Sequence, residues 1–383
     1  MESTLTPSRR SQPASSPPTS AALPLPLWGA LRRNFLAIDV LILGFVAILI
    51  GWALLAQAAP GLRLYPYEAR YEWAQHSPWS VIAELSVYFL VYLGAQRLGL
   101  LYHRKYFVQN RKAPRWLELC NIAYVFLPVA FIPFIFNLLG AYISGVSGVP
   151  GIQTHPGHDP AADYDRAATY WDLWLKHVDI SVFGVYAPQW MRQFQRPWLT
   201  GVMMVCYLSY YVSPFVAVLP QILKRDWRIV RRVAAIYAGV LLLTYVGYIA
   251  LPATGPRFEG GPAAWLPQQP GWFGAQWWAT VLNNAEVIRW DAFPSGHVAV
   301  ALVALVVALR YHRRVGLVYL PFVAGLVVAT MYLGYHYASD VIAAFVLAGF
   351  TFVALEPAIR WWESIWQAPH PNHAGAPASN PIS

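Results

Sequence analysis

Charged side chains are scarce in this sequence. Asp, Glu, Lys and Arg together make up only 12% of its 383 residues, whereas hydrophobic residues make up 57%. An ordinary soluble domain carries about 25% charged residues. The shortage of charge argues against a soluble protein and indicates a chain that lies largely within a membrane.

Cysteine is nearly absent as well. The chain has two, Cys120 and Cys206, and both lie within apolar runs without a CxxC spacing. This excludes a disulfide framework and a cysteine-based zinc module. Aromatic residues, by contrast, are abundant, with 18 Trp and 23 Tyr. Such amphipathic rings are typical of membrane–water interfaces.

Long apolar runs occupy much of the remaining chain. A helix needs about 20 mostly apolar residues to cross the hydrocarbon core of a bilayer. The sequence therefore predicts an all-α fold, a polytopic membrane helical bundle of about eight transmembrane helices. The spans are expected near residues 35–57, 79–98, 119–145, 198–221, 233–251, 296–310, 315–333 and 338–355.

Basic residues are distributed unevenly over the loops between these spans. Most of the 27 fall on the side that would hold both termini, and cytoplasmic loops carry an excess of Lys and Arg. We therefore expect an integral membrane protein with both termini in the cytoplasm. Loops 252–295 and 334–337 would lie on the non-cytoplasmic face of a plasma or inner membrane, or on a lumenal face. The net charge of +9 then reports orientation, and no nucleic-acid partner is expected.

Histidine and carboxylate side chains gather in those two outer loops. His336 and Asp340 are four residues apart, a spacing that would place them on one face of a helix. A carboxylate that accepts from Nδ1 would fix the tautomer and leave Nε2 free as a base or nucleophile. Such a pair can equally anchor the start of a span, and both interpretations stay open for the pair alone.

A second polar group precedes the sixth span. Ser295 is a favoured helix N-cap, but a helix N-terminus also binds anions, and Gly296 would let a ligand approach the backbone. His297 could protonate a departing oxygen. Arg257 and Arg289 offer positive charge suited to phosphate. Together these residues predict an outer pocket for phosphoryl chemistry through a histidine.

The motifs that carry these residues resemble those of a known superfamily. PSGH at 294–297, followed by HYASD at 336–340, resembles the second and third signature motifs of the type 2 phosphatidic acid phosphatase and haloperoxidase superfamily. The resemblance covers about residues 175–355. It implies a six-helix phosphatase-type core and a phospholipid or lipid phosphate substrate.

The resemblance also implies roles for individual residues. His336 would be the nucleophile that attacks phosphorus, with Asp340 as its orienting partner. His297 would be the general acid, while Ser295 and the Gly296 amide would hold phosphate oxygens. No metal and no other cofactor is implied.

Two departures from the superfamily's motifs favour one branch of it. GPR at 255–257 stands where a Lys and an Arg-Pro are usual, and Ala329 and Thr330 replace a Ser-Arg. HYASDVIAAF is similar to sphingomyelin synthases and inositol phosphorylceramide synthases, and 179–190 resembles the inositolphosphotransferase group. This favours transfer of a phosphorylated headgroup to a lipid acceptor. Hydrolysis, with water as the acceptor, is the alternative.

The predicted organisation follows from the spans and the resemblance. We expect a disordered cytoplasmic tail over 1–33, two transmembrane helices over 34–100, a phosphatase/phosphotransferase-type membrane domain over 116–356 and a cytoplasmic tail over 357–383. The acidic outer segment 151–197, which includes Asp172 and Asp179, has two interpretations. It is either an interfacial loop or a cap that gates the substrate.

Two alternatives from other functional classes remain. Zinc-dependent hydrolysis could use His297, His336 and Asp340, or His155 and His158, although no ordinary catalytic-zinc spacing is present. A transporter or scaffold could bind an anion in the outer pocket without catalysis.

Overall fold

The computed structural model describes residues 36–58, 170–258, 271–285 and 290–364, together with single helical residues between 83 and 136. All regular structure within these residues is helical. The predicted spans over 79–98 and 119–145 lie almost wholly outside the described residues, and the predicted tail over 1–33 lies entirely outside them.

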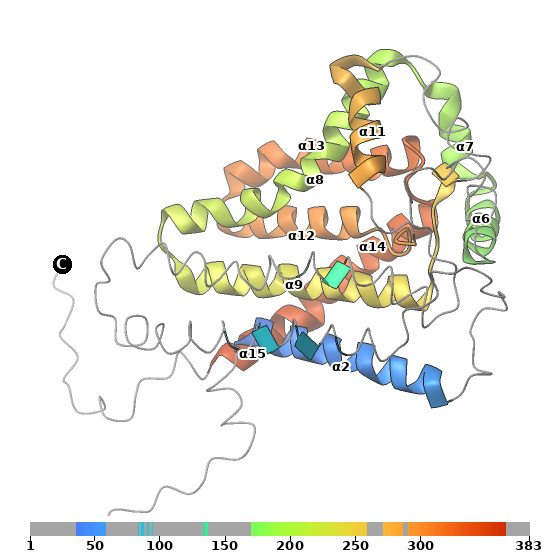
Figure 1. Ribbon diagram of the computed structural model, residues 1–383. Coiled ribbons are helices and arrows are strands. Elements are labelled where there is room, and N and C mark those ends of the chain that lie inside the picture. The colour runs from blue at the N-terminus through green and yellow to red at the C-terminus, as the bar shows by residue number, and fades with distance from the viewer. Residues whose placement is uncertain are drawn as a thin grey trace, which may run out of the picture.

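The long helices run side by side as a bundle (Figure 1). They are α2 (Ala37–Ala58), α8 (Pro197–Leu223), α9 (Trp227–Ala250), α12 (Gly296–Tyr311) and α13 (Arg313–Tyr332). The last stretch is α14 (Ala338–Phe350), which continues through the π-helical turn η5 (Thr351–Leu355) into α15 (Glu356–Glu363). Helix α8 packs on α13 and α12, and α2 packs on α9.

Four helical stretches among the described residues are long and apolar enough to cross a membrane. They are Pro197–Leu223, Trp227–Ala250, Arg313–Tyr332 and Ala338–Glu363. Each matches one of the predicted spans, and together they indicate an integral membrane protein. Two shorter apolar helices, Ala37–Gly51 and Gly296–Tyr311, coincide with two further predicted spans.

Helix α12 occupies the centre of the bundle, in contact with α8, α9, α13 and α14. Its small residues Ala299, Ala301 and Ala304 are completely buried, because small side chains let neighbouring helices approach closely. The helix has only 16 residues, or about 24 Å, which is shorter than the roughly 30 Å hydrocarbon core. The buried loop that precedes it, residues 290–295, therefore enters the bundle at that end.

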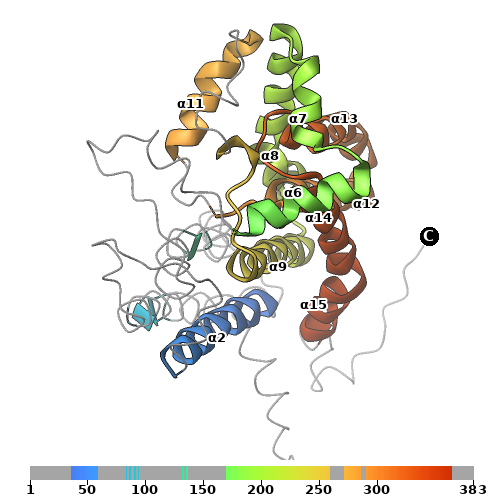
Figure 2. The same ribbon diagram turned by 90° about the vertical axis from the view of Figure 1, so that its right-hand side faces the viewer.

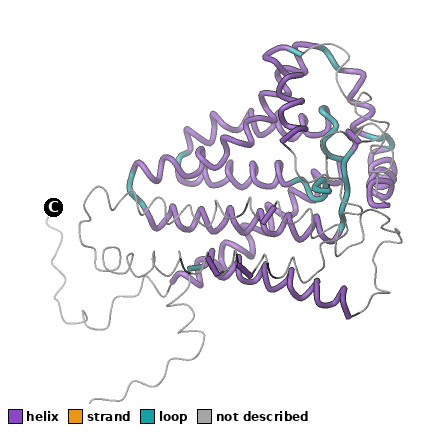
Figure 3. The backbone as a smooth tube through the Cα atoms, in the orientation of Figure 1, coloured by secondary structure: helices purple, strands orange, loops and turns teal. Residues whose placement is uncertain are grey.

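The longer loops gather at one end of the bundle, as Figure 3 shows. Helix α6 (Tyr170–Phe183) lies across this end (Figure 2). The short elements nearby are α7 (Ala187–Met191), η2 (Arg192–Phe194), η3 (Pro256–Phe258), η4 (Trp272–Gly274) and α11 (Ala275–Ala285). The opposite end carries the turns α8–α9 and α12–α13.

Gly247, near the end of α9, allows the 290–295 loop to pack closely. A Cβ atom at this position would collide with the ring of Pro294. We expect Gly247→Ala to lower the free energy of unfolding by about 1–3 kcal/mol through overpacking. Thermal unfolding of the purified protein measures this. Gly349→Ala in α14 is the matched control, because nothing lies within 4 Å of its added Cβ. Equal behaviour of the two variants would contradict the prediction.

Candidate active site

Three loops meet at the end of the bundle that α6 crosses: 251–258, 290–295 and 333–337. Backbone hydrogen bonds tie them to one another and to α14. The N–H of Arg257 donates to the carbonyl oxygen of Gly334 at 2.7 Å, and the N–H of Ala292 donates to that of Ala253 at 3.0 Å. The N–H of Ser295 donates to the carbonyl oxygen of Asp340 at 3.2 Å. Segments far apart in the sequence therefore form one layer.

His336 lies in the loop between α13 and α14, where its side chain is buried. It is not on the same helix as Asp340, because α14 begins only at Ala338. Its Nδ1 lies 2.9 Å from the carbonyl oxygen of Ala292 and 3.5 Å from Oδ2 of Asp340. A carbonyl oxygen can only accept, so in the neutral ring we assign the proton to Nδ1 and leave Nε2 with a free lone pair.

This proton on His336 determines the protonation of its neighbours. Nε2 of His336 lies 3.5 Å from Nδ1 of His297, and Nε2 of His297 lies 3.0 Å from the hydroxyl of Tyr207. Because Nε2 of His336 accepts, Nδ1 of His297 must donate and its Nε2 must accept from Tyr207. The two histidines thus face each other as an acceptor and a proton donor.

Tyrosine rings from α8 and the 333–337 loop surround His297. Tyr207 stacks on Tyr335 with ring centroids 4.5 Å apart, and Tyr210 lies 4.4 Å from the His297 ring. Sequence reasoning missed Tyr207. The YLSYY run at 207–211, inside an apolar span, could have pointed to Tyr207, because polar groups inside a span are often functional.

Arg257 lies beside the tyrosines and is only 9% exposed. Its Nη1 donates to Oδ1 of Asn283 in α11 at 3.0 Å, and its guanidinium carbon lies 4.6 Å from the ring centroid of Tyr335. Gly255 has φ +91°, and a Cβ there would lie 2.5 Å from the carbonyl oxygen of Tyr335. Glycine thus permits the turn that brings Arg257 to the site. Asn283 was another residue that the sequence did not reveal.

Asp340 binds backbone instead of orienting His336 by a hydrogen bond. Its Oδ2 accepts from the N–H of Tyr337 at 2.9 Å, in the first turn of α14. The carbonyl of Ala292 therefore supplies the hydrogen bond to Nδ1 that we expected from Asp340. The side chain of Asp340 is completely buried, and its Oδ2 lies 3.5 Å from Nδ1 of His336.

Ser295 acts as the N-cap of α12. Its Oγ accepts from the N–H of Val298 at 3.4 Å, and its side chain is completely buried. The N–H groups of Gly296 and His297 belong to the first turn, which an α-helix leaves without intrahelical acceptors. These two amides are suited to an anion near the histidines.

Some of the predicted residues lie outside the described part of the chain. These are Arg289 and the alternative zinc ligands His155 and His158. Among the described residues, no group of three or more His, Cys, Asp or Glu side chains is arranged to hold a metal ion.

Asp291 is a half-buried carboxylate that sequence reasoning left unassigned, although it lies three residues before the start of the PSGH motif. Burial raises its pKa above the usual value, and the nearby charges of Arg257 and His336 oppose that rise. Burial lowers the pKa of His336 to about 4, with Asp291 and the Ala292 hydrogen bond acting in the opposite direction. His336 is therefore neutral, and able to act as a nucleophile, at neutral pH.

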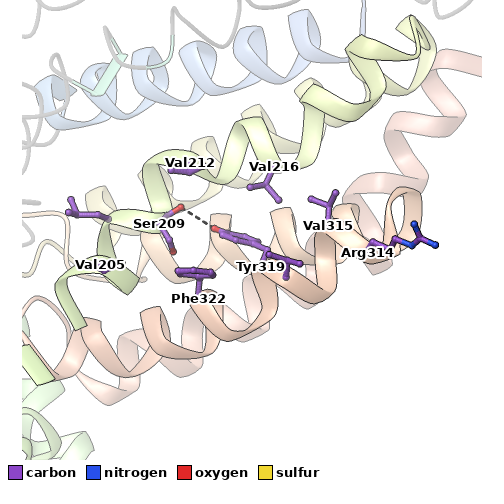
Figure 4. A pocket seen from close by; sticks show the side chains of 10 residues that line it. Val205, Ser209, Val212, Val216, Arg314, Val315, Tyr319 and Phe322 are labelled. Atoms are coloured by element: carbon purple, nitrogen blue, oxygen red, sulfur yellow. Dashed lines mark hydrogen bonds between the residues drawn. The ribbon is translucent and has the colours of Figure 1, made fainter. Parts of the chain in front are cut away.

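A groove of about 670 Å³ lies between α8 and α13 (Figure 4). Its lining is almost entirely apolar, and one charged side chain, Arg314, lies at its edge. Val205 and Leu208 of the groove flank Tyr207, which contacts His297. The same stretch of α8 therefore lines the groove on one face and the histidine pair on another.

Comparisons with known proteins bear on this arrangement. Residues 174–354 match the family model of the PAP2 superfamily. The PAP2 match extends from α6 into η5 and includes the three loops of the site. It supports the superfamily named by the sequence resemblance, whereas the inositolphosphotransferase and sphingomyelin synthase branch receives no support from it. A comparison with curated proteins and one with solved structures found no match.

The burial of His336 predicts that its imidazole becomes protonated only at a pH well below the usual value for histidine. With its pKa lowered to about 4, the folded protein resists protonation between about pH 6.5 and 4, whereas the unfolded chain binds the proton in that window. Stability should therefore fall as the pH falls through this range. Exchange of the imidazole C2 hydrogen with deuterium, followed by mass spectrometry, measures the midpoint for His336. A midpoint at or above 6.5 would contradict the prediction.

Proposed function

We propose that this protein is a membrane-embedded enzyme that breaks and forms phosphoester bonds of lipids through a phosphohistidine at His336. The observation that carries the proposal is the facing pair of histidines. An unprotonated Nε2 and a protonated Nδ1 lie 3.5 Å apart, next to Arg257 and within the segment that matches the PAP2 superfamily. A nucleophile beside an acid is what displacement at phosphorus requires.

In the proposed first step, Nε2 of His336 attacks phosphorus and the bond to the leaving oxygen breaks. His297 acts as the imidazolium, having taken up a second proton at Nε2 when the anionic substrate binds; it gives its Nδ1 proton to that oxygen and becomes neutral. In the second step, an acceptor hydroxyl returns a proton to His297 while its oxygen attacks phosphorus and the phosphorus–nitrogen bond breaks. Arg257 and the amides of Gly296 and His297 stabilise the charge on the phosphate oxygens. Arg289 is proposed as a second cation on sequence grounds alone.

We further propose that a lipid hydroxyl is the acceptor, so that a phosphorylated headgroup passes between lipids. The burial of His336 supports this, because it limits the access of water to the intermediate. The departures of the motifs from the usual phosphatase pattern point the same way. Hydrolysis of phosphatidic acid or a polyprenyl-type phosphate is the alternative, and the nature of the product distinguishes the two.

The reaction is proposed to take place on the non-cytoplasmic face. Basic residues concentrate at the opposite end of the bundle from His336, in the turns α8–α9 and α12–α13 and in the helix ends beside them. They are Lys224, Arg225, Arg228, Arg310, Arg313 and Arg314. An excess of Lys and Arg marks the cytoplasmic side.

Removing either histidine tests the chemistry. We expect His336→Ala and His297→Ala to lower turnover of labelled phospholipid by at least about 10³-fold, because each removes a group that reacts. An acid-labile phosphoryl adduct should form on the wild type and be missing from His336→Ala. The assay contains purified protein, labelled phospholipid, and either a ceramide or diacylglycerol acceptor or none.

The alternatives make different predictions in the same assay. Transfer yields a new lipid only when the acceptor is present, whereas hydrolysis releases phosphate or a phosphorylated headgroup without it. A transporter or scaffold retains its activity in His336→Ala. A zinc hydrolase loses activity with a strong chelator. Absence of the adduct under turnover would refute the phosphohistidine.

The groove supports a lipid as the substrate, with a hydrocarbon chain between α8 and α13. We expect Val212→Trp, which fills the groove, to raise KM for a long-chain lipid phosphate by about tenfold, equivalent to losing roughly 60 Å² of apolar contact. KM for a short, soluble phosphate ester should be unchanged. Leu219→Trp is the matched control, because Leu219 is similarly exposed on α8 but does not line the groove. Equal effects on both substrates would exclude the groove as the chain site.

A further inference from the structure

Helix α6 carries two completely buried carboxylates, although it lies at the edge of the protein. Asp172 and Asp179 are both 0% exposed, whereas Leu173 and Ile180, one residue further along, are 54% and 44% exposed. The two acids are seven residues apart, so they project from the same face of the helix. That face is turned towards the loops of the candidate active site.

Asp172 joins two of these loops through a single oxygen. Its Oδ1 accepts from the backbone N–H groups of Thr254 and Gly255, each at 2.9 Å, and from the hydroxyl of Tyr337 at 3.1 Å. Thr254 and Gly255 lead directly to Arg257. Tyr337 is the residue after His336. The carboxylate of Asp172 therefore connects the loop that carries Arg257 with the loop that carries His336.

Asp179 binds the start of the helix that follows the nucleophile. Its two oxygens accept from the N–H groups of Ala338 and Ser339, both at 2.8 Å. These are first-turn amides of α14, which have no acceptor within the helix. With Asp340 on the N–H of Tyr337 at 2.9 Å, carboxylates hold three consecutive amides next to His336.

Burying carboxylates is expensive unless several donors compensate. Main-chain carbonyl oxygens or an asparagine side chain could have accepted hydrogen bonds from these loops without a charge. The carboxylates of Asp172 and Asp179 bind backbone N–H groups beside His336 and so restrict where that backbone can lie. Charge-assisted hydrogen bonds are about twice as strong as neutral ones and restrict the backbone accordingly.

We propose that Asp172 and Asp179 are positioning residues through which α6 holds the Arg257 loop and the His336 loop in the relative arrangement that phosphoryl transfer needs. The proposal rests on the proposed function and extends it to a helix outside the histidine site. Asp172 precedes the segment that matches the PAP2 superfamily. Segment 151–197 was expected to be either an interfacial loop or a cap over the substrate. The proposed role of α6 corresponds to the cap.

A double-mutant cycle tests the link between Asp172 and Arg257. We expect Asp172→Ala to lower kcat/KM by about 10²-fold, as displacement of a binding group by about 1 Å does. Asp172→Asn should stay within about tenfold of wild type, because its oxygen still accepts from the same donors. In an Arg257→Ala background, Asp172→Ala should cost much less, because the two residues act as one unit.

A matched control separates positioning from general damage to the fold. His177→Ala changes an exposed side chain on the same helix and should leave kcat/KM unchanged. Full additivity of Asp172→Ala and Arg257→Ala, or an equal loss in Asp172→Asn and Asp172→Ala, would overturn the proposal for Asp172. For Asp179, whose two oxygens each accept from a separate N–H, an unchanged kcat/KM in Asp179→Ala would overturn it likewise.

Amide hydrogen exchange tests the role of Asp172 without relying on enzyme activity. In the full-length protein, Asp172→Ala should speed amide hydrogen exchange in both the 252–257 and the 333–339 segments. Faster exchange in the first segment alone would refute the coupling of the two loops. If the wild type forms no His336 adduct, the proposed function fails, while the exchange experiment still decides whether α6 couples the loops.

Discussion

The hydrogen bond from Nδ1 of His336 to the carbonyl oxygen of Ala292, at 2.9 Å, governs the chemistry of the whole site. A carbonyl cannot donate, so the bond leaves only one consistent set of protons along His336, His297 and Tyr207. The unprotonated nitrogen of one ring then faces the protonated nitrogen of the other. Reactivity here depends on a backbone atom, and the position of that atom depends on how the 290–295 loop enters the bundle.

The loop is held by packing on one side and by hydrogen bonds on the other. The central helix α12 has 16 residues and is shorter than α8, α9 and α13, which pack against it. Its shortness leaves room for the buried backbone of the loop. Buried backbone groups need partners, and those of this loop are the carbonyl oxygens of Ala253 and Asp340 and the imidazole of His336. The apolar bundle and the polar network therefore depend on each other. The short α12 leaves space for the 290–295 loop, and hydrogen bonds fix the position of that loop.

Several residues of the site could be predicted from the sequence, and others could not. His297, His336 and Arg257 stand out because polar side chains at the ends of apolar spans are costly and invite a functional explanation. Tyr207 and Asn283 do not, because they lie on helices distant in the chain from the residues that they contact. Ala292 does not either, because it acts through its backbone carbonyl oxygen. The four-residue spacing of His336 and Asp340 does bring Nδ1 and Oδ2 to 3.5 Å, although α14 begins only after the histidine and the same Oδ2 accepts from the backbone N–H of Tyr337.

Composition and periodicity by themselves determined that this chain is a helical membrane protein, because hydrocarbon solvent tolerates only long apolar segments with internally satisfied backbones. They also located the polar motifs at span ends. The tertiary structure alone decided which histidine nitrogen is free, which oxygen holds it, and that α6 fastens two loops together. Proton positions and loop register depend on contacts between residues 40 to 170 positions apart in the chain, and a linear pattern carries no information about such contacts.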